Sequence, residues 1–429
     1  MNAARSSPIL RTGLALAAIT FSLAVCAQAQ TETVLYSFPG GSAGQAPYTG
    51  VISDSSGNFY GVTEEGGQTG GNCFSYGCGV VYELSPNGSG GWTETVLHAF
   101  TGGADGNFPV STLLLDAAGN LYGTTDSGGN VNACAPYGCG VVFELSPSSS
   151  GWTETVLHTF NGSNGTGPSN LIRDAAGNLY GTTGLGGTSN KGTVFKLSPV
   201  SGGWIEIVLH AFTGGTDGYI PNGLVLDPAG NLYGTTGFGG NLADCFSQGC
   251  GVVFKLTSGV GGWHETVLYT FTGAADGSLP NGVILDSAGR LYGTAYYGGN
   301  STCNSAGCGV VFRLISGVSG WRESVLLTFS GGNGTNPAAN LVQDAAGNLY
   351  GTTYFGGNGS CNNGLGCGVV FKLAPTSTGG WIPSQLHAFH KTDGSDSQAT
   401  LVLDAAGNLY GTTLAGGADN DGAVFEIQP

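Results

Sequence analysis

The stretch Asp116-Ala-Ala-Gly-Asn-Leu-Tyr-Gly-Thr-Thr125 decides the fold, because it occurs seven times along the 429-residue chain with little change. Asp at the first position and Gly at the fourth position of a four-residue segment favour a type I turn. In one copy Pro228 stands at the second position, where such a turn requires a φ near about −65°. Each copy is therefore predicted to be two antiparallel strands joined by a tight turn. The other six copies occupy residues 54–63, 174–183, 227–236, 286–295, 344–353 and 404–413.

Four predicted strands make up each repeat. In the repeat around Asp116 they are A (113–116), B (121–125), C (141–145) and D (152–160), each short, rich in β-branched and aromatic residues, and bounded by Gly, Pro or Ser. The repeated Tyr residues lie 53 to 62 residues apart. A period of this length suits a four-stranded propeller blade better than most solenoid repeats. The pattern predicts an all-β chain of seven blades.

The two ends of the repeat array complement each other. Residues 31–38 have the pattern of a D strand, whereas the last repeat stops after its C strand, residues 423–427. If the first strand completes the last blade, seven blades close into a ring without an unpaired blade edge at the seam. We therefore predict a closed seven-bladed β-propeller that forms a single domain over residues 30–429.

The charge of the chain excludes some partners. Eleven Lys and Arg oppose 27 acidic residues, for a net charge of −16, which becomes −18 when a leader with Arg5 and Arg11 is removed. Binding of nucleic acid or of an anionic membrane needs a basic face. We expect neither partner, and we expect a monomer.

Residues 1–29 have the pattern of an export signal. Arg5 and Arg11 precede an apolar run at 14–25, and Ala27-Gln-Ala29 provides small residues for cleavage before Gln30. A lipoprotein that keeps Cys26 is the alternative. After cleavage the protein is expected to be secreted or periplasmic.

Ten cysteines follow the leader, in five closely spaced pairs. An even number of cysteines in an exported chain is typical of disulfides, and the common short spacing favours local pairing. Zinc binding by thiolates is the alternative, although zinc prefers tighter spacing and His partners. The predicted disulfides are Cys73–Cys78, Cys134–Cys139, Cys245–Cys250, Cys303–Cys308 and Cys361–Cys367.

Two kinds of side chain recur at one position of strand D. A Trp opens six D strands, and a His follows later in four of them, at His98, His158, His210 and His387. Equivalent copies on outer strands indicate packing between blades, and residues spread so regularly around a ring do not converge on one metal. The sequence gives no reason to assign a metal or a catalytic residue. The repeated Trp residues are Trp92, Trp152, Trp204, Trp263, Trp321 and Trp381.

The D-to-A and B-to-C loops emerge on one face, and they vary most. Variable loops on a rigid scaffold are the usual location of binding sites. Directly after strand B, three consecutive repeats carry aromatic residues in place of the small or acidic residues found elsewhere. An aromatic shelf at the mouth of the ring could stack on sugars or hold a peptide, although covering neighbouring loops is the alternative role. The predicted ligand-binding residues are Phe238, Tyr296, Tyr297, Tyr354 and Phe355.

Acidic residues on the same face suggest two further activities. Asp-Gly pairs at Asp105, Asp217, Asp276 and Asp393, and the segment 419–422, could offer oxygen ligands to calcium. The spacing matches no complete calcium loop, and Asp-Gly turns explain the same residues. Glu64 and Glu65 are the first candidates if two carboxylates cleave a glycoside across the channel.

The repeated motifs Gly-Asn-Leu-Tyr-Gly-Thr-Thr, Gly-Val-Val-Phe-x-Leu and Trp-x-Glu-x-Val-Leu-His-x-Phe resemble those of the GloVer tandem-repeat (choice-of-anchor) family of exported bacterial proteins. The resemblance covers residues 31–429 and implies an exported protein, commonly tethered by a C-terminal anchor, without an established activity. No anchor motif precedes Pro429, so we expect free secretion or a periplasmic location.

Three functions are compatible with these patterns. The leading prediction is a secreted, non-enzymatic binding propeller whose variable face engages a glycan or an extracellular protein. The alternatives are a carbohydrate-active hydrolase or lyase with acidic residues at the channel mouth, and a structural component of the envelope.

Overall fold

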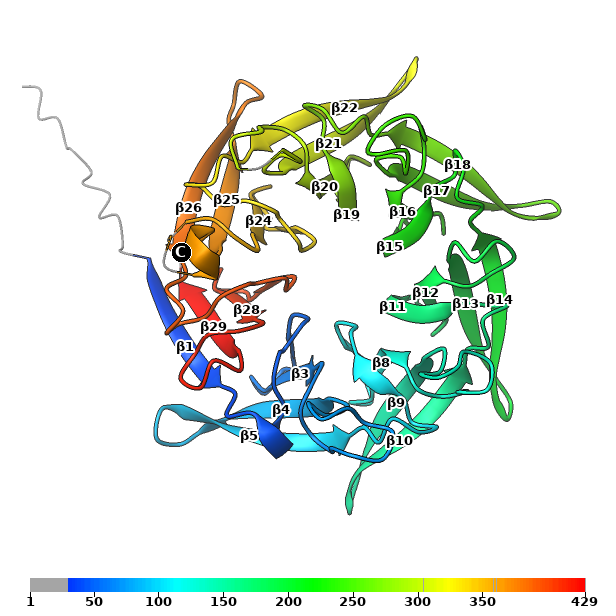
Figure 1. Ribbon diagram of the computed structural model, residues 1–429, viewed down its shortest axis with the longest axis vertical. Coiled ribbons are helices and arrows are strands. Elements are labelled where there is room, and N and C mark those ends of the chain that lie inside the picture. The colour runs from blue at the N-terminus through cyan, green and yellow to red at the C-terminus, as the bar shows by residue number, and fades with distance from the viewer. Residues whose placement is uncertain (1–29, 304, 358, 360, 429) are drawn as a thin grey trace, which may run out of the picture.

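Seven antiparallel sheets surround a central channel in the computed structural model (Figure 1). Six sheets have four strands, and the second has five because its inner strand is divided into β6 (Asn107–Pro109) and β7 (Leu114–Leu115). The structure describes residues 30–303, 305–357, 359 and 361–428. The predicted seven-bladed propeller is therefore confirmed. The predicted leader and Cys26 lie outside the described residues. Within the described residues, no helix has the length and apolar character needed to cross a membrane.

The blades follow one another along the chain. Blade 1 comprises β2 (Ile52–Ser53), β3 (Phe59–Thr63), β4 (Val80–Asn87) and β5 (Gly91–Ala99). Blade 2 comprises β6 (Asn107–Pro109), β7 (Leu114–Leu115), β8 (Leu121–Ser127), β9 (Val141–Ser148) and β10 (Gly151–Thr159). Blade 3 comprises β11 (Thr166–Arg173), β12 (Leu179–Leu185), β13 (Thr193–Val200) and β14 (Gly203–Ala211). Blade 4 comprises β15 (Tyr219–Leu226), β16 (Leu232–Phe238), β17 (Val252–Gly259) and β18 (Gly262–Thr270).

The remaining three blades complete the ring. Blade 5 comprises β19 (Ser278–Leu285), β20 (Leu291–Tyr297), β21 (Val310–Gly317) and β22 (Gly320–Thr328). Blade 6 comprises β23 (Val342–Gln343), β24 (Leu349–Thr352), β25 (Val369–Pro375) and β26 (Trp381–Ala388). Blade 7 comprises β27 (Val402–Leu403), β28 (Leu409–Thr413), β29 (Ala423–Gln428) and β1 (Thr31–Ser37). Two short 3-10 helices, η1 (Gly41–Ala43) and η2 (Asn362–Gly364), lie in loops.

The first strand closes the ring as predicted. β1 pairs antiparallel with β29, from Thr31 opposite Gln428 to Ser37 opposite Ala423. Figure 1 shows β1 as the outer strand of the blade that β27, β28 and β29 begin. This pairing covers the edge that β29 would otherwise expose at the seam.

The repeated Asp organises the tight turn between the two inner strands. Asp116 Oδ1 accepts the N–H groups of Ala118 and Asn120, each at 2.9 Å, and Oδ2 accepts the Tyr122 hydroxyl at 3.1 Å. Desolvation acts to raise the pKa of Asp116, but these hydrogen bonds outweigh it and lower that pKa. The Asp residues of the motif thus form turns, as expected.

The core lies between neighbouring blades. Each hydrophobic cluster joins strands of adjacent blades, such as Val142 and Phe160 of blade 2 with Phe195 of blade 3. The repeated Trp contributes here, because Trp204 of blade 3 meets Tyr122 of blade 2 edge to face, with ring centroids 6.5 Å apart. The expected packing role of the Trp residues is confirmed.

Inner strands differ between the two halves of the ring. In blades 3, 4 and 5 they are continuous over eight residues, whereas in the other blades they are interrupted or only two residues long. The sequence explains this difference, because five residues separate Pro168 from Asp174 in blade 3, but six separate Pro109 from Asp116 in blade 2. The extra residue interrupts pairing with the next strand. The channel wall is consequently asymmetric.

Candidate functional site

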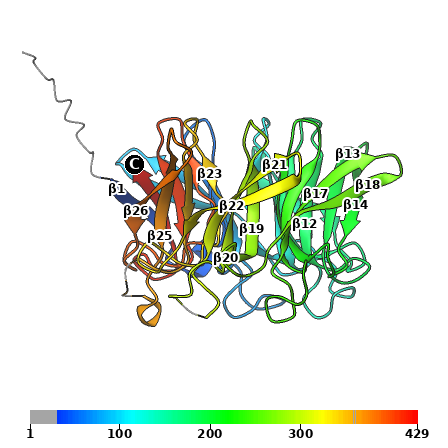
Figure 2. The ribbon, with the colours of Figure 1, turned by 90° about the horizontal axis from the view of Figure 1, so that it is seen from above.

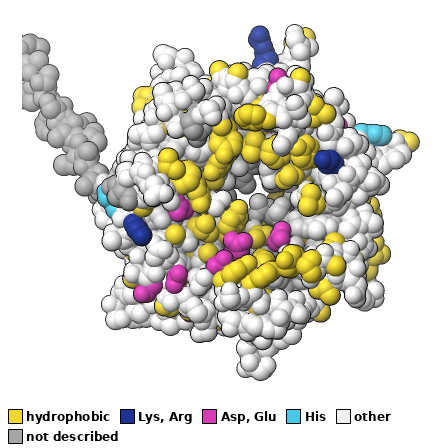
Figure 3. All heavy atoms as spheres, viewed as in Figure 1, with side chains coloured by type: hydrophobic (Ala, Val, Ile, Leu, Met, Phe, Trp, Pro, Cys, Tyr) yellow, Lys and Arg dark blue, Asp and Glu magenta, His cyan; other side chains and the backbone are white. Residues whose placement is uncertain are grey.

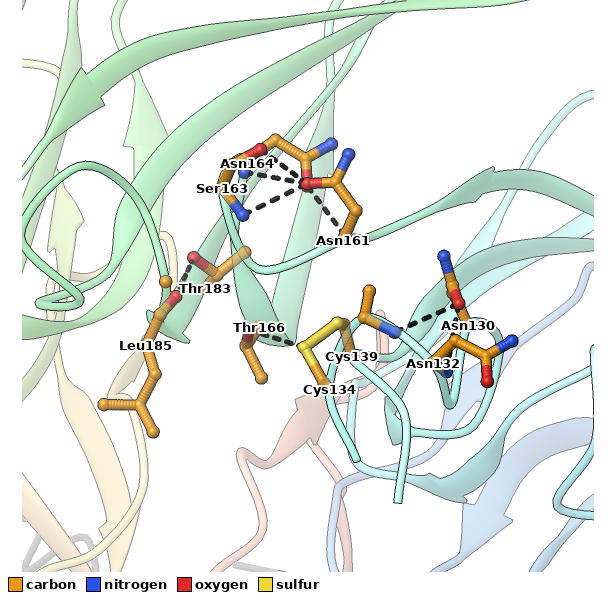
Figure 4. Close-up of a disulfide and its surroundings, with 12 residues drawn as sticks. Asn130, Asn132, Cys134, Cys139, Asn161, Ser163, Asn164, Thr166, Thr183 and Leu185 are labelled. Atoms are coloured by element: carbon orange, nitrogen blue, oxygen red, sulfur yellow. Dashed lines mark hydrogen bonds between the residues drawn. A yellow bond between two sulfur atoms is a disulfide. The ribbon is translucent and has the colours of Figure 1, made fainter. Parts of the chain in front are cut away.

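The long D-to-A and B-to-C loops gather on one side of the ring (Figure 2), which we call the loop face. All five predicted disulfides form there and are confirmed. Figure 4 shows the Cys134–Cys139 bridge of blade 2 beside Thr166, at the start of the inner strand of blade 3. Each bridge thus stiffens a loop that reaches the next blade.

A backbone hydrogen bond connects each B-to-C loop to the next blade. The N–H of Phe108 in blade 2 donates to the carbonyl of Cys78 in blade 1 at 3.1 Å. The residues that donate at this position all have a φ between 52° and 65°, a region that few non-glycine residues adopt. Sequence analysis did not identify this position, although it directly precedes a repeated Pro in most blades. The equivalent donors are Ala46, Gly167, Ile220, Leu279, Asn336 and Asp396.

The central channel contains a cavity of about 590 Å³ lined by residues of all seven blades. Its described lining is rich in Asn, Thr, Ser and Gly, includes the carboxylates of Glu64 and Asp126, and has no Lys or Arg. Figure 3 shows acidic side chains beside the central opening, with hydrophobic side chains above and below it. A cavity of this kind disfavours anions and offers many hydrogen-bonding groups to a neutral polar ligand.

Burial changes the acid–base properties of this cavity. Desolvation, followed by the charges of Glu65 and Asp126, raises the pKa of Glu64 to about 7. Desolvation also raises the pKa of Tyr48, with contributions from Glu64 and Asp126. Glu64 therefore titrates near neutral pH and can donate a proton or a hydrogen bond.

Glu64 and Glu65, the two candidates for glycoside cleavage, lie in different places. Glu64 lines the cavity, whereas Glu65 is outside the lining and accepts a hydrogen bond from Gln45 Nε2 at 2.8 Å. The half-buried Glu64 and the exposed Asp126 of the next blade are therefore the acidic pair at this site. Asp126 was not singled out by sequence analysis, although it occupies the position in its repeat that Glu64 occupies in its own.

The predicted aromatic shelf lies on blades 4, 5 and 6, where the side chains form neighbouring pairs. Tyr296 lines the cavity and meets Tyr297 edge to face, with ring centroids 4.7 Å apart. Tyr354 and Phe355 form a similar pair at 4.4 Å. Phe238 instead stacks on a residue of its own blade, described next. Burial raises the pKa of Tyr296, and the neighbouring Tyr297 and Tyr354 add to the shift.

Phe238 forms the end of the shelf on blade 4. Its ring stacks on Tyr219 with centroids 5.2 Å apart, and Lys191 Nζ lies 4.3 Å from the Tyr219 ring centroid. Thr236 Oγ1 donates to the Phe238 carbonyl at 2.8 Å. The second Thr of the motif Gly-Thr-Thr thus orients the backbone at the start of the shelf.

A second aromatic group lies on the loop face of blades 1 and 2, and sequence analysis missed it. Phe74 stacks on Tyr76 and on Phe108, with ring centroids 5.2 and 5.5 Å apart, and lies 5.4 Å from Tyr137. Tyr76 is 41% exposed and Tyr137 is 55% exposed. We call Phe74, Tyr76, Phe108 and Tyr137 the aromatic platform. The sequence does not indicate this platform, because its residues come from three loops whose sequences do not repeat.

The Asp residues considered for calcium have partners within their own loops. Asp105 accepts hydrogen bonds from the Thr101 N–H at 2.8 Å and from the Thr101 hydroxyl at 2.6 Å. His98 Nε2 lies 3.5 Å from the same carboxylate. Blade 3 repeats this arrangement with Thr213, Asp217 and His210. These contacts give the recurring Asp and His residues a structural role in the D-to-A loops.

The fold and its loop face define a class of protein, namely a disulfide-stabilised seven-bladed β-propeller with an acidic, aromatic-flanked channel mouth. The model of the Gloeobacter/Verrucomicrobia repeat matches residues 12–246 and 240–429. The chain therefore belongs to the Gloeobacter/Verrucomicrobia repeat family, as the repeated motifs indicated.

Comparison with solved structures shows the propeller fold in other proteins. The extracellular domain of a protein described as a one-component system, from B. thetaiotaomicron, is 8% identical, with a TM-score of 0.54, and the match covers 92% of this chain and 40% of that one. A gluconolactonase from Xanthomonas campestris is 14% identical, with a TM-score of 0.40, over 72% of this chain and 82% of that one. A protein of Bacteroides fragilis described as a 6-phosphogluconolactonase is 13% identical, with a TM-score of 0.46, over 77% and 83%. Comparison with curated proteins gave no match.

Proposed function

We propose that this protein is a secreted, non-enzymatic propeller that binds carbohydrate on its loop face. The observation that carries the proposal is the presence of two aromatic groups on the loop face, the platform on blades 1 and 2 and the shelf on blades 4, 5 and 6. The central opening between these blades is flanked by acidic side chains (Figure 3). Aromatic rings stack on the apolar faces of sugars, while carboxylates and amides accept or donate hydrogen bonds to hydroxyl groups. A glycan chain that lies across the mouth can use both kinds of contact.

The chemistry of the cavity supports a neutral or cationic glycan over an anionic one. Glu64 and Asp126 contribute negative charge, and the described lining has no Lys or Arg. The net charge of −16 disfavours polyanions in general. Five disulfides are consistent with an oxidising extracellular environment, where such glycans are exposed.

A glycoside hydrolase or lyase is the second candidate function. It is favoured by the pKa of Glu64, which burial raises to about 7, because a proton donor needs such a pKa beside an ionised partner. Asp126 is the available partner, since its carboxylate lines the same cavity. In this alternative Glu64 protonates the leaving oxygen and Asp126 acts on the opposite side of the bond.

A glycan array probed with the mature chain tests the proposal. Selective binding to neutral or cationic glycans, followed by recovery of the intact glycan after long incubation, supports a binding protein. Cleavage of the bound glycan that is lost in Glu64→Gln but retained in Glu65→Gln establishes the enzyme instead. A chain that binds nothing selectively favours a structural role in the envelope.

A further inference from the structure

One D-to-A loop departs from the others in a way that brings two histidines to one carboxylate. His387 of β26 occupies the repeated His position, and Asp393 occupies the repeated Asp position. In blade 1 the residue after the buried Phe is Thr101, whose hydroxyl binds Asp105 Oδ1. In blade 6 the residue at this position is His390, so the loop gains an imidazole where blades 1 to 5 have a hydroxyl or an amide and blade 7 has Pro39.

The three side chains of this loop converge. His387 Nε2 lies 3.0 Å from Asp393 Oδ2, and His390 Nδ1 lies 3.7 Å from the same oxygen. The His390 N–H donates to Asp393 Oδ1 at 2.7 Å, which holds the carboxylate in place. Among the described residues, this is the one set of three His, Cys, Asp or Glu side chains whose ligand atoms all lie within 4.8 Å of one another.

These distances match the requirements of a metal ion. Zinc binds His nitrogen and carboxylate oxygen at about 2.0–2.2 Å, so tetrahedral ligand atoms lie roughly 3.3 Å apart. The separations of 3.0 and 3.7 Å are close to that value. His390 is 56% exposed, which leaves a path from solvent, whereas His387 and Asp393 are mostly buried. Two imidazoles favour zinc over calcium, which prefers oxygen ligands alone.

The fourth position of the site faces solvent, because the His390 side chain is 56% exposed. Zinc sites with three protein ligands complete their coordination with a water molecule.

We propose that His387, His390 and Asp393 form a zinc site on the outer edge of blade 6, with water as the fourth ligand. The site is separate from the channel mouth, and it does not depend on the carbohydrate-binding proposal.

Zinc titration of the oxidised, EDTA-treated mature chain tests this site. We expect one zinc ion per chain with micromolar or tighter affinity by calorimetry, and visible absorption bands of a four-coordinate ion when cobalt replaces zinc. His390→Thr restores the residue of blade 1 and should weaken zinc binding at least tenfold while the metal-free melting temperature is kept. His98→Gln, in the blade that has the His–Asp pair but no second His, is the matched control and should leave binding unchanged.

Absence of zinc binding at 100 µM metal, or equal affinity in the parent and in His390→Thr, would overturn the site.

Discussion

Thr412 Oγ1 donates a hydrogen bond to the carbonyl oxygen of Thr49 at 2.8 Å, although 363 residues separate the two along the chain. Thr412 belongs to the last blade and Thr49 to the first, so this bond crosses the seam of the ring. The same first Thr of the motif Gly-Thr-Thr reaches the next blade elsewhere, as Thr294 does to the carbonyl of Ala339 at 3.0 Å. The motif therefore connects blades as well as forming strands.

Substitution of this seam residue should destabilise the ring. Thr412→Val keeps the shape of the side chain but leaves the buried carbonyl of Thr49 without this donor, which costs about 1–3 kcal/mol. We expect a lower melting temperature by circular dichroism. Thr124→Val is the matched control, because the Thr124 hydroxyl is buried without a partner among the described residues. An equal loss of stability in both variants would show that the seam bond has no special importance.

The turn Asp residues should make the protein sensitive to acid. Hydrogen bonds overcome desolvation and lower the pKa of Asp116 in the folded chain. Its contribution to stability is therefore complete above the unfolded pKa of about 4 and is lost as the pH falls through the folded value. We expect Asp116→Asn to be less stable than the parent at pH 6, with the difference shrinking toward pH 2. A difference that stays constant in thermal melts across this range would refute the linkage.

The glutamates of the outer strands should make the folded chain less stable as the pH rises, which is opposite to the effect of the turn Asp residues. Burial raises the pKa of Glu154 to about 7, with the charge of His98 lowering it and that of Asp105 raising it. A carboxyl whose pKa is higher in the folded chain than in the unfolded chain lowers the free energy of unfolding as the pH rises between the two pKa values. Glu154→Gln should thus raise the melting temperature more at pH 8 than at pH 5. Thr153→Gln, at the exposed neighbouring position, should show no such pH dependence.

Each disulfide should contribute modestly to stability. The loop between Cys134 and Cys139 is short, so the chain-entropy estimate for its closure is about 2 kcal/mol. The double variant Cys134→Ala/Cys139→Ala should melt a few degrees lower and keep the far-ultraviolet spectrum of the parent. Loss of that spectrum at 25 °C would mean that this bridge is needed for folding.

The fold could be predicted because its determinants are local and repeated. The turn formed by Asp116 and its neighbours needs only the five consecutive residues from Asp116 to Asn120. The D-type strand at residues 31–38, which has no A, B or C strand before it, indicates how the ring closes. The five disulfides followed from the spacing of the cysteines. Tyr296 and Glu64, which occupy equivalent positions of the repeat, both line the channel cavity, and their roles stay predictions.

The remaining part of the site depends on contacts between loops that do not repeat. Phe74, Phe108 and Tyr137 come from three loops of two blades, and Phe108 adopts a positive φ. The convergence of His390 on Asp393 likewise depends on how one altered loop folds back. Such arrangements are set by tertiary packing, which no local pattern in one sequence reports.

The most direct test of the central claim compares carbohydrate binding on the two faces of the ring. The strongest hit from the glycan array is titrated by calorimetry into the parent, into Tyr76→Ser and Phe355→Ser on the loop face, and into Val318→Ser. Val318 lies in the exposed turn between β21 and β22, at the opposite face. If the loop face binds carbohydrate, binding should be at least tenfold weaker in both loop-face variants and unchanged in Val318→Ser. Parental affinity in both loop-face variants would contradict the proposed function.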